Sequence, residues 1–335
     1  MQASVFIDLE GGSLQPQDVS LLKHPNVAGV ILFGRNTVDA DQVERLVGEI
    51  KALRADLLVA LDQEGGRVQR LRNGVSRIPA MGRILTQCEG DIKQASEHAE
   101  TLGWLMCSEL AALGIDFSFA PVLDVDYGHN QVIGDRSFAG DIEALNHLAD
   151  AFRLGVKAAG MISVGKHFPG HGWAQADTHT SSAMDHRTLD EIMAKDVAPF
   201  AHAIQGGIEA MMPAHVTYAA VDSMPAGFST YWLQDVLRCQ LGFEGVIFSD
   251  DLTMQAAADM GSYAQRAALA INAGCDVLLP CNNRQGVLEV LAYFEQQGVK
   301  PCDKVSGLLR TNSVNIQSDT ARTLQAQQIL AIYNT

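Results

Sequence analysis

Residues 164–179 read VGKHFPGHGWAQADTH, and this stretch best indicates how the chain folds. Its first residues suit a short strand, whereas the proline and glycines at 169, 170 and 172 interrupt any regular element further on. We therefore predict a strand over residues 163–167 that opens into a long polar loop. Within fourteen positions it carries five titratable side chains: Lys166, His167, His171, Asp177 and His179. Long loops with ionisable groups on a rigid scaffold are common sites of catalysis, so the stretch predicts an enzyme.

Short apolar runs of the same kind recur along the chain. They are continuous rather than alternating, which is typical of strands in a buried parallel sheet. We predict eight strands, over residues 4–8, 28–33, 57–62, 116–125, 163–167, 209–213, 245–249 and 277–280.

Longer stretches between these strands have helical character. Asp39 and Ser229 are suitable N-cap residues for two of them. The predicted helices cover residues 39–54, 92–113, 143–159, 189–204, 230–239, 263–273 and 285–295.

This alternation predicts a (β/α)8 barrel, a fold that needs about 250 residues, with a doubly wound sheet as the alternative. The strand ends favour the barrel, because a barrel brings them to one mouth, where active sites lie. Polar side chains stand at these ends: Asp8, Arg35, Asp62, Asp124, Lys166, His167, His215, Asp250 and Asn282. The remaining length suits long loops after strands three to five and extra C-terminal helices over about 299–332. We expect a single domain over residues 1–335.

Composition narrows the class of protein. The net charge of −15 argues against nucleic acid, because a phosphate backbone requires a basic face. No positive charge precedes Lys23 and the apolar runs are too short to span a bilayer, so we expect no signal peptide and no membrane partner. The six cysteines lack paired spacing and suit the core of a protein in a reducing compartment. A cytoplasmic protein is predicted.

The polar loop raises the question of a metal, because histidine and carboxylate bind zinc. However, Pro169 and Gly170 break any helix that could present two histidines one turn apart, and Lys166 beside His167 would oppose a dication. We therefore predict no metal.

A nucleotide cofactor is also not expected. The stretch from Asp62 to Arg70 has two glycines after a strand but lacks the spacing of a dinucleotide fingerprint, and no glycine-rich loop ends in Lys-Ser or Lys-Thr. We predict no cofactor. Asp, Arg, Lys and His around one mouth suit a polyhydroxylated ligand held by charge-assisted hydrogen bonds.

The turn Ser249-Asp250-Asp251 follows a predicted strand and precedes helical sequence. One carboxylate there can point into the mouth while the next caps the helix, although both could serve as caps. With the rest of the chain considered, Asp250 is a candidate nucleophile.

Four segments, in order, resemble the blocks of glycoside hydrolase family 3 β-N-acetylglucosaminidases. They are Asp62 to Arg70, the GDRSFAGD stretch around Arg136, Lys166–Gly172 followed by Asp177-Thr178-His179, and Ser249-Asp250-Asp251. The similarity runs across nearly the whole chain and is closest to the compact bacterial cytoplasmic enzymes of cell-wall recycling.

The resemblance implies a (β/α)8 barrel that removes non-reducing terminal N-acetylglucosamine with retention, particularly from 1,6-anhydro-N-acetylmuramoyl peptides. Asp250 would be the nucleophile, His179 the proton donor and acceptor, and Asp177 its orienting partner. The sugar would be held by Asp62, Arg70, Arg136, Lys166 and His167. Asp251 would keep a capping role. The sequence departs from the family at Thr178, where serine is expected, and Trp173 has no matching role.

Alternatives stay open for several of these residues. Arg70 and Arg136 could be ion-pair partners of barrel aspartates, and His171 is expected to order the loop by hydrogen bonding. Asp124 and His215 are expected to shape the pocket or to orient Arg136 and Lys166. Asp177 could itself be the acid.

The leading hypothesis is a retaining hydrolase of peptidoglycan recycling, with links to cell-wall biogenesis, cell shape, division and the cell cycle. Its partner would be a muropeptide or another N-acetylglucosamine-containing saccharide, and we expect a monomer. A glycoside phosphorylase is the alternative enzyme, because a histidine acid repels phosphate less than a carboxylate does. A non-catalytic sugar-binding barrel is the alternative outside enzymes.

Overall fold

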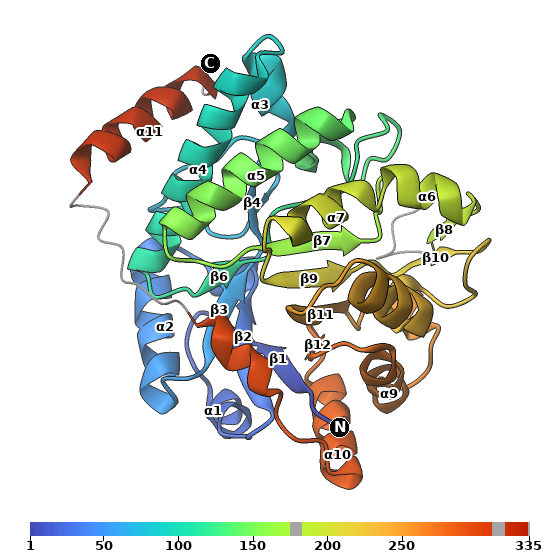
Figure 1. Cartoon of the computed structure of the whole chain (residues 1–335). Helices are drawn as coiled ribbons and strands as arrows, with labels where there is room; N and C mark the ends of the chain where they lie inside the picture. Colours follow the sequence, from blue (N-terminus) through green and yellow to red (C-terminus); the bar gives the residue numbers. More distant parts are fainter. Residues whose placement is uncertain (175–182, 310–318, 334–335) are drawn as a thin grey trace.

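Eight parallel strands form one sheet in the computed structural model, which describes residues 1–174, 183–309 and 319–333 (Figure 1). Each of these strands begins within two residues of the position where a strand was predicted to begin. The strands are β1 (Ser4–Asp8), β2 (Val27–Leu32), β3 (Leu58–Leu61), β6 (Phe117–Ser118), β7 (Val164–Phe168), β9 (Ala210–Pro213), β11 (Val246–Asp251) and β12 (Val277–Leu279).

The sheet closes on itself. β1 pairs with both β2 and β12, so the first and last strands are neighbours. Between β6 and β7 the ring is completed by the chain that follows β6. Val164 N donates to Ala120 O at 2.8 Å, and Leu123 N donates to Lys166 O at 2.7 Å. This arrangement confirms the predicted (β/α)8 barrel.

Helices cover the outside of the barrel (Figure 1). The longer ones match the predicted segments, while α1, α3 and α8 are additional short helices. The helices around the barrel are α1 (Pro16–Leu22), α2 (Ala40–Leu53), α3 (Gly82–Gln87), α4 (Ile92–Ala112), α5 (Ile142–Ala158), α6 (Leu189–Lys195), α7 (Ala198–Gln205), the π-helical η4 (Tyr231–Gln240), α8 (Gln255–Ala258), α9 (Tyr263–Ala273) and α10 (Arg284–Gln297).

Two predicted elements are wrong in extent, and proline explains both. The strand predicted over 116–125 is regular only in β6, because Pro121 has no N–H to donate to a neighbouring strand. The helix predicted over 189–204 is divided into α6 and α7. Pro199 cannot donate to the carbonyl four residues earlier and instead occupies the first turn of α7.

Aromatic side chains fill the inside of the barrel. Phe6, Phe117, Phe119 and Phe248 are buried and meet mostly edge to face, with ring centroids 5.3–6.1 Å apart. Gly29 on β2 makes room for this packing, because a Cβ there would lie 2.6 Å from the Phe6 ring. The interior is therefore a packed core, which leaves the mouth of the barrel for a binding site.

The C-terminal part of the chain packs on this barrel, as predicted. Val305 and Leu308, in the short helix η5 (Asp303–Leu308), join the apolar cluster inside the barrel. Helix α11 (Thr320–Tyr333) lies beside α4, where the Tyr333 hydroxyl is 2.8 Å from His98 Nδ1 (Figure 1).

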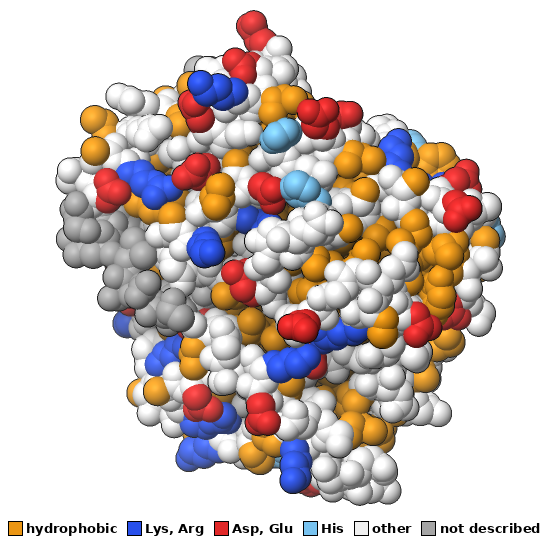
Figure 2. Space-filling view, viewed as in Figure 1, with side chains coloured by type: hydrophobic (Ala, Val, Ile, Leu, Met, Phe, Trp, Pro, Cys, Tyr) orange, Lys and Arg blue, Asp and Glu red, His pale blue; other side chains and the backbone are white. Residues whose placement is uncertain are grey.

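The surface carries charges of both signs. On the face shown in Figure 2, acidic and basic side chains are interspersed with apolar ones. None of the helices in the described ranges has the length and apolar character needed to cross a membrane.

Candidate active site

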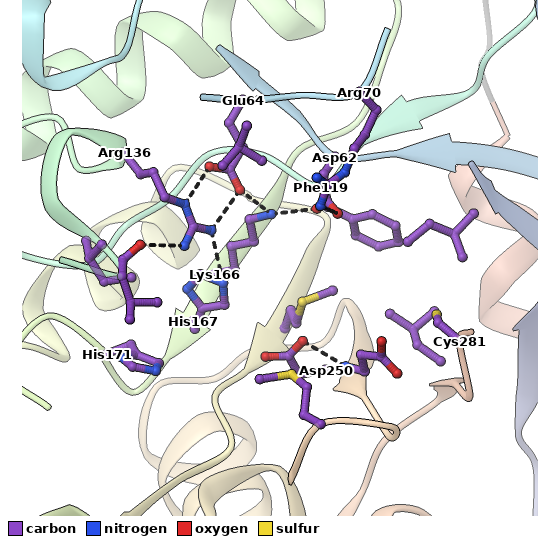
Figure 3. A pocket seen from close by; sticks show the side chains of 18 of the residues that line it. Asp62, Glu64, Arg70, Phe119, Arg136, Lys166, His167, His171, Asp250 and Cys281 are labelled. Atoms are coloured by element: carbon purple, nitrogen blue, oxygen red, sulfur yellow. Dashed lines mark hydrogen bonds and ion pairs between the residues drawn. The ribbon is translucent and has the colours of Figure 1, made fainter. Parts of the chain in front are cut away.

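A cavity of about 530 Å³ opens at the carboxyl ends of the barrel strands (Figure 3). Its size falls within the usual range for small-molecule sites, and its position is where barrel enzymes carry out their chemistry. Apolar side chains such as Phe33, Phe119 and Met212 contribute to its lining. Six of the residues predicted from the sequence line it: Asp62, Arg70, Arg136, Lys166, His167 and Asp250.

Asp62 is held between two cations. Its Oδ1 lies 2.9 Å from Lys166 Nζ, and its Oδ2 lies 3.1 Å from Arg70 Nη2. Burial alone would raise the pKa of the Asp62 carboxyl, but the charges of Lys166 and Arg70 outweigh burial and hold this pKa well below its ordinary value. Asp62 is therefore a fixed anion and hydrogen-bond acceptor at the cavity wall.

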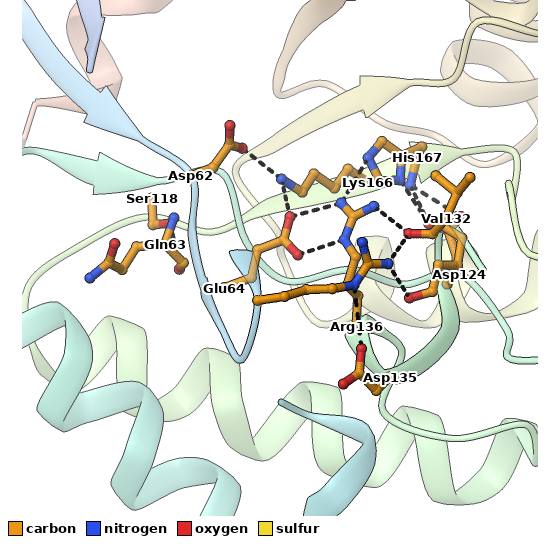
Figure 4. A network of polar contacts seen from close by, with 12 residues as sticks. Asp62, Gln63, Glu64, Ser118, Asp124, Val132, Asp135, Arg136, Lys166 and His167 are labelled. Atoms are coloured by element: carbon orange, nitrogen blue, oxygen red, sulfur yellow. Dashed lines mark hydrogen bonds and ion pairs between the residues drawn. The ribbon is translucent and has the colours of Figure 1, made fainter. Parts of the chain in front are cut away.

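Glu64 is a site residue that the sequence reasoning missed. Its carboxylate receives two hydrogen bonds from Arg136, at 2.8 Å from Nε and 2.9 Å from Nη2, and lies 2.6 Å from Lys166 Nζ (Figure 4). Burial alone would raise the pKa of Glu64, but the charges of Arg136 and Lys166 outweigh burial and lower this pKa to about 2. The sequence did contain one indication of Glu64: it lies two residues after Asp62, and in an extended chain these two side chains point to the same side.

Both arginines form ion pairs, as the alternative for them proposed, although the partner of Arg136 is a glutamate and not a barrel aspartate. Arg70 and Arg136 are both ion-pair partners of carboxylates, Asp62 and Glu64 respectively. Both arginines also line the cavity, so each can be paired with a carboxylate and still be accessible to a ligand.

The expected partners of Asp124 are wrong. Asp124 is fully buried and contacts His167 and His171 rather than Arg136 or Lys166. Its Oδ2 lies 2.7 Å from His167 Nδ1, and its Oδ1 accepts from His171 N at 2.6 Å. Burial opposes the charged carboxyl, but the two histidines keep the pKa of Asp124 below its ordinary value. The Nδ1 contact leaves His167 Nε2 to face Arg136 Nη2, 3.5 Å away.

The two remaining histidines of the strand ends differ. The backbone of His171 is held by Asp124 and by Asn130, whose side chain donates to His171 O at 2.7 Å, and His171 Nδ1 lies 3.4 Å from Asn130 Nδ2. Its side chain also lines the cavity. His215 stacks on Phe228, with ring centroids 5.0 Å apart and planes 15° from parallel.

Asp250 and Asp251 end strand β11 and both line the cavity. Asp250 Oδ1 accepts from Asp251 N at 2.7 Å. The Asp251 carboxylate accepts from Thr253 N at 2.8 Å and Thr253 Oγ1 at 2.7 Å, so it closes a turn before α8, which is close to its predicted capping role. Burial raises the pKa of Asp251 to about 6, and the charge of Asp250 acts in the same direction.

The two remaining predicted residues, Asp177 and His179, lie outside the described residues. Within the described ranges, no three His, Cys, Asp or Glu side chains are grouped so as to hold a metal ion.

The arrangement can bind a neutral, hydroxyl-rich ligand between unlike walls. One wall offers Asp62, Arg70, Arg136, Lys166 and His167 as fixed donors and acceptors. Asp250 faces this network from the opposite wall (Figure 3). A carboxylate so placed can stabilise positive charge that develops on a ligand, or attack it.

Comparisons with known proteins agree with this geometry. The family model described as the glycosyl hydrolase family 3 N terminal domain matches residues 6–306. A β-hexosaminidase of Tolumonas auensis is 51% identical over 311 residues, covering 92% of this chain and 91% of the relative. A β-hexosaminidase of Pseudomonas aeruginosa strain LESB58 is 50% identical over 301 residues, covering 90% and 89%. The crystal structure of NagZ from Neisseria gonorrhoeae in complex with N-trifluoroacetyl-D-glucosamine superimposes with a TM-score of 0.89 at 38% identity, covering 99% of this chain and 98% of that chain.

Proposed function

The chain belongs to glycosyl hydrolase family 3, and we propose that it is a retaining exo-β-N-acetylglucosaminidase of peptidoglycan recycling. Its relatives support a glycoside hydrolase of the β-N-acetylhexosaminidase type. The proposed substrate is N-acetylglucosamine linked to 1,6-anhydro-N-acetylmuramic acid, with or without peptide, from which the terminal N-acetylglucosamine is removed.

The observation that carries this proposal is the position of Asp250 across the cavity from the Asp62–Lys166–Glu64–Arg136 network. Hydroxyl groups of one sugar can pair with the fixed carboxylates and cations of that network, and in the proposed complex the anomeric carbon faces Asp250. The cations of the network are already paired with carboxylates. Such pairs suit a neutral ligand, because its hydroxyl groups can hydrogen-bond to both partners and need no unpaired cation.

The proposed reaction is a double displacement. A carboxylate oxygen of Asp250 forms a bond to the anomeric carbon while the bond to the leaving oxygen breaks, and His179 donates its proton to that oxygen. In the second step His179 takes a proton from water, whose oxygen displaces Asp250. Asp177 would fix the tautomer of His179 and stabilise its charged form.

Trapping tests the nucleophile. A slow fluorinated substrate should leave a sugar covalently attached to Asp250, which peptide mass analysis would locate. The neighbouring acetamido group is the alternative nucleophile, and it would leave no label on the protein. A label on another residue, or an inverted product, contradicts the assignment of Asp250.

Replacement of His179 by Ala tests the acid. Turnover of a disaccharide should fall by roughly 10²–10⁴, the usual contribution of general acid–base catalysis. An aryl glycoside with a good leaving group needs less proton donation and should suffer less. If Asp177 is the acid instead, the His179 variant will keep near-normal turnover of the disaccharide.

Two alternative functions are separated by one assay on an aryl N-acetyl-β-glucosaminide and the matching glucoside, with and without phosphate. A hydrolase releases free N-acetylglucosamine in both conditions. Accumulation of the sugar 1-phosphate would support a phosphorylase, and tight binding without turnover would support a sugar-binding barrel. We further propose that the protein acts as a single-domain monomer in the cytoplasm, where recycling would connect it with cell-wall biogenesis, cell shape and cell division.

A further inference from the structure

Arg187 lies just after strand β8 (Ala183–Asp185), which pairs in parallel with β10 (Val216–Tyr218) next to α6 (Figure 1). Its guanidinium binds two carboxylates. Nη2 lies 2.6 Å from Asp185 Oδ2, and Nη1 lies 2.7 Å from Asp196 Oδ2. The side chain is only 12% exposed, so these are partly desolvated pairs with a defined geometry.

The same guanidinium also contacts aromatic rings on the other side. Its carbon lies 4.7 Å from the centroid of the Trp173 ring and 5.2 Å from that of Tyr127, and Nη1 is 2.9 Å from the Tyr127 hydroxyl. Trp173 meets Tyr127 edge to face, with centroids 5.0 Å apart. Arginine suits this position, because its planar fork can bind carboxylates at its edge and rings on its face.

Trp173 and Asp185 belong to opposite ends of one chain segment. Residues 175–182, which carry Asp177 and His179, connect Ala174 to Ala183. Arg187 therefore joins the residues that precede this segment to those that follow it.

Each end also has its own anchor. On the first side, the Asn130 side chain donates to Ala174 O at 2.6 Å, and the Tyr218 hydroxyl donates to Gly170 O at 2.7 Å. On the second side, Ala183 is in register with Val216 of β10. Arg187 adds a side-chain contact between these two anchored ends, beside the link that β10 provides through Tyr218 and its pairing with β8.

We propose that Arg187 is a positioning residue for the acid–base step, which it supports by fixing both ends of residues 175–182. This inference rests on the proposed role of His179. In general, a chain segment whose ends are held together has fewer conformations available to it than one with free ends. A displacement of about 1 Å in a catalytic group can lower the rate by roughly 10²-fold. Loss of Arg187 should therefore lower kcat/KM mainly for substrates whose reaction is limited by proton donation.

The test compares leaving groups. Arg187→Ala and Arg187→Lys are assayed on a series of aryl N-acetyl-β-glucosaminides, from dinitrophenyl to unsubstituted phenyl, and on a disaccharide. We expect kcat/KM to fall by roughly 10–100-fold on the poor leaving groups and several-fold less on the dinitrophenyl substrate. The lysine variant keeps one charge and should recover part of the loss.

Arg238 offers a matched control. Its guanidinium is 14% exposed, lies 2.8 Å from Asp276 Oδ2 and donates to two backbone carbonyls, at Phe243 and Gly245. Arg238→Ala removes a comparable buried pair that includes neither Trp173 nor Asp185, so it should affect all substrates equally. If Arg187→Ala does not fold, Trp173→Ala replaces it, because Trp173 is 39% exposed and its loss should preserve folding.

A double variant separates this inference from the proposed function. If Arg187 acts through His179, adding Arg187→Ala to His179→Ala should cause no further loss on poor leaving groups. Equal losses on all substrates, or additive losses in the double variant, would overturn the positioning role while leaving His179 as the acid. Normal disaccharide turnover by His179→Ala would overturn both.

Discussion

Glu64 and Arg136 are joined by two parallel hydrogen bonds inside the cavity, of 2.8 and 2.9 Å. Glu64 also lies 2.6 Å from Lys166 Nζ, so one carboxylate contacts two cations that line the cavity. The geometry is the bidentate form of the arginine–carboxylate pair, which is both strong and directional. Glu64 thus organises the binding wall before any ligand arrives.

Replacement of Glu64 by Gln should weaken both folding and binding. Arg136 would then lose the carboxylate with which it pairs and Lys166 one of its two, and breaking a buried pair costs about 3–5 kcal/mol of unfolding free energy. Urea unfolding measures this loss, and the KM for an aryl glycoside should rise. The control is Asp135→Asn. Asp135 is 53% exposed and 3.6 Å from Arg67, so its loss should cost less than about 1 kcal/mol. Similar small losses in the two variants would contradict the role of Glu64.

Replacement of Asp124 by Asn should impair the site through His167. An amide cannot accept the Nδ1 proton and both backbone N–H groups as the carboxylate does, so the imidazole should change its tautomer. Hydrogen bonds to a charged group contribute about 1.5–3 kcal/mol, so kcat/KM should fall by roughly 10–100-fold. Asp126→Asn is the control, because the Asp126 side chain accepts from Gly128 N outside this cavity. A normal kcat/KM for Asp124→Asn would refute the positioning of His167.

The pH dependence of stability should change when Asp251 is replaced by Asn. The folded-state pKa of Asp251 is raised to about 6, from 3.8, by burial and by Asp250. Between these values the folded protein binds more protons than the unfolded chain, so this residue's contribution to stability is lost as pH rises through about 6. Asn keeps an acceptor for Thr253 without the charge. Denaturant unfolding at pH 5 and pH 8 should therefore show a smaller decline for Asp251→Asn than for the natural protein.

The control for this series is Asp56→Asn, at an exposed carboxylate whose pKa is lowered by its hydrogen bond to Arg54. Because that group is ionised in both states above pH 5, its replacement should leave the decline between pH 5 and pH 8 unchanged. The same decline in Asp251→Asn as in the natural protein would disprove the buried, proton-binding state of Asp251.

Activity should survive exhaustive chelation. The proposed reaction uses Asp250 and His179 and assigns no step to a metal. Dialysis against a strong chelator followed by the aryl glycoside assay is the measurement, with added zinc as the comparison. Activity that disappears on chelation and returns with zinc would refute a metal-independent mechanism.

Local pattern was sufficient for most of the barrel. Apolar runs bounded by turn residues predict strands wherever they occur, because a buried parallel strand needs apolar side chains on both faces. β1 was predicted with its observed bounds, and Asp62 and Asp250 were placed at the cavity because they stand at or next to strand ends. Lys166 also lines the cavity, although it lies in the middle of β7 and not at its end. The pattern failed where a single proline altered the backbone hydrogen bonding, at Pro121 and Pro199.

Which side chains meet across the cavity was decided only by the tertiary structure. Glu64 and Arg136 are 72 residues apart in the chain, and Asp62 and Lys166 are 104 apart. Such contacts depend on closure of the barrel, which sets the distance between strand ends that have no local relationship in the sequence. The sequence therefore determined which kinds of side chain stand at the mouth of the barrel. Closure of the ring determined that Asp124 holds His167 and that Glu64 holds Arg136.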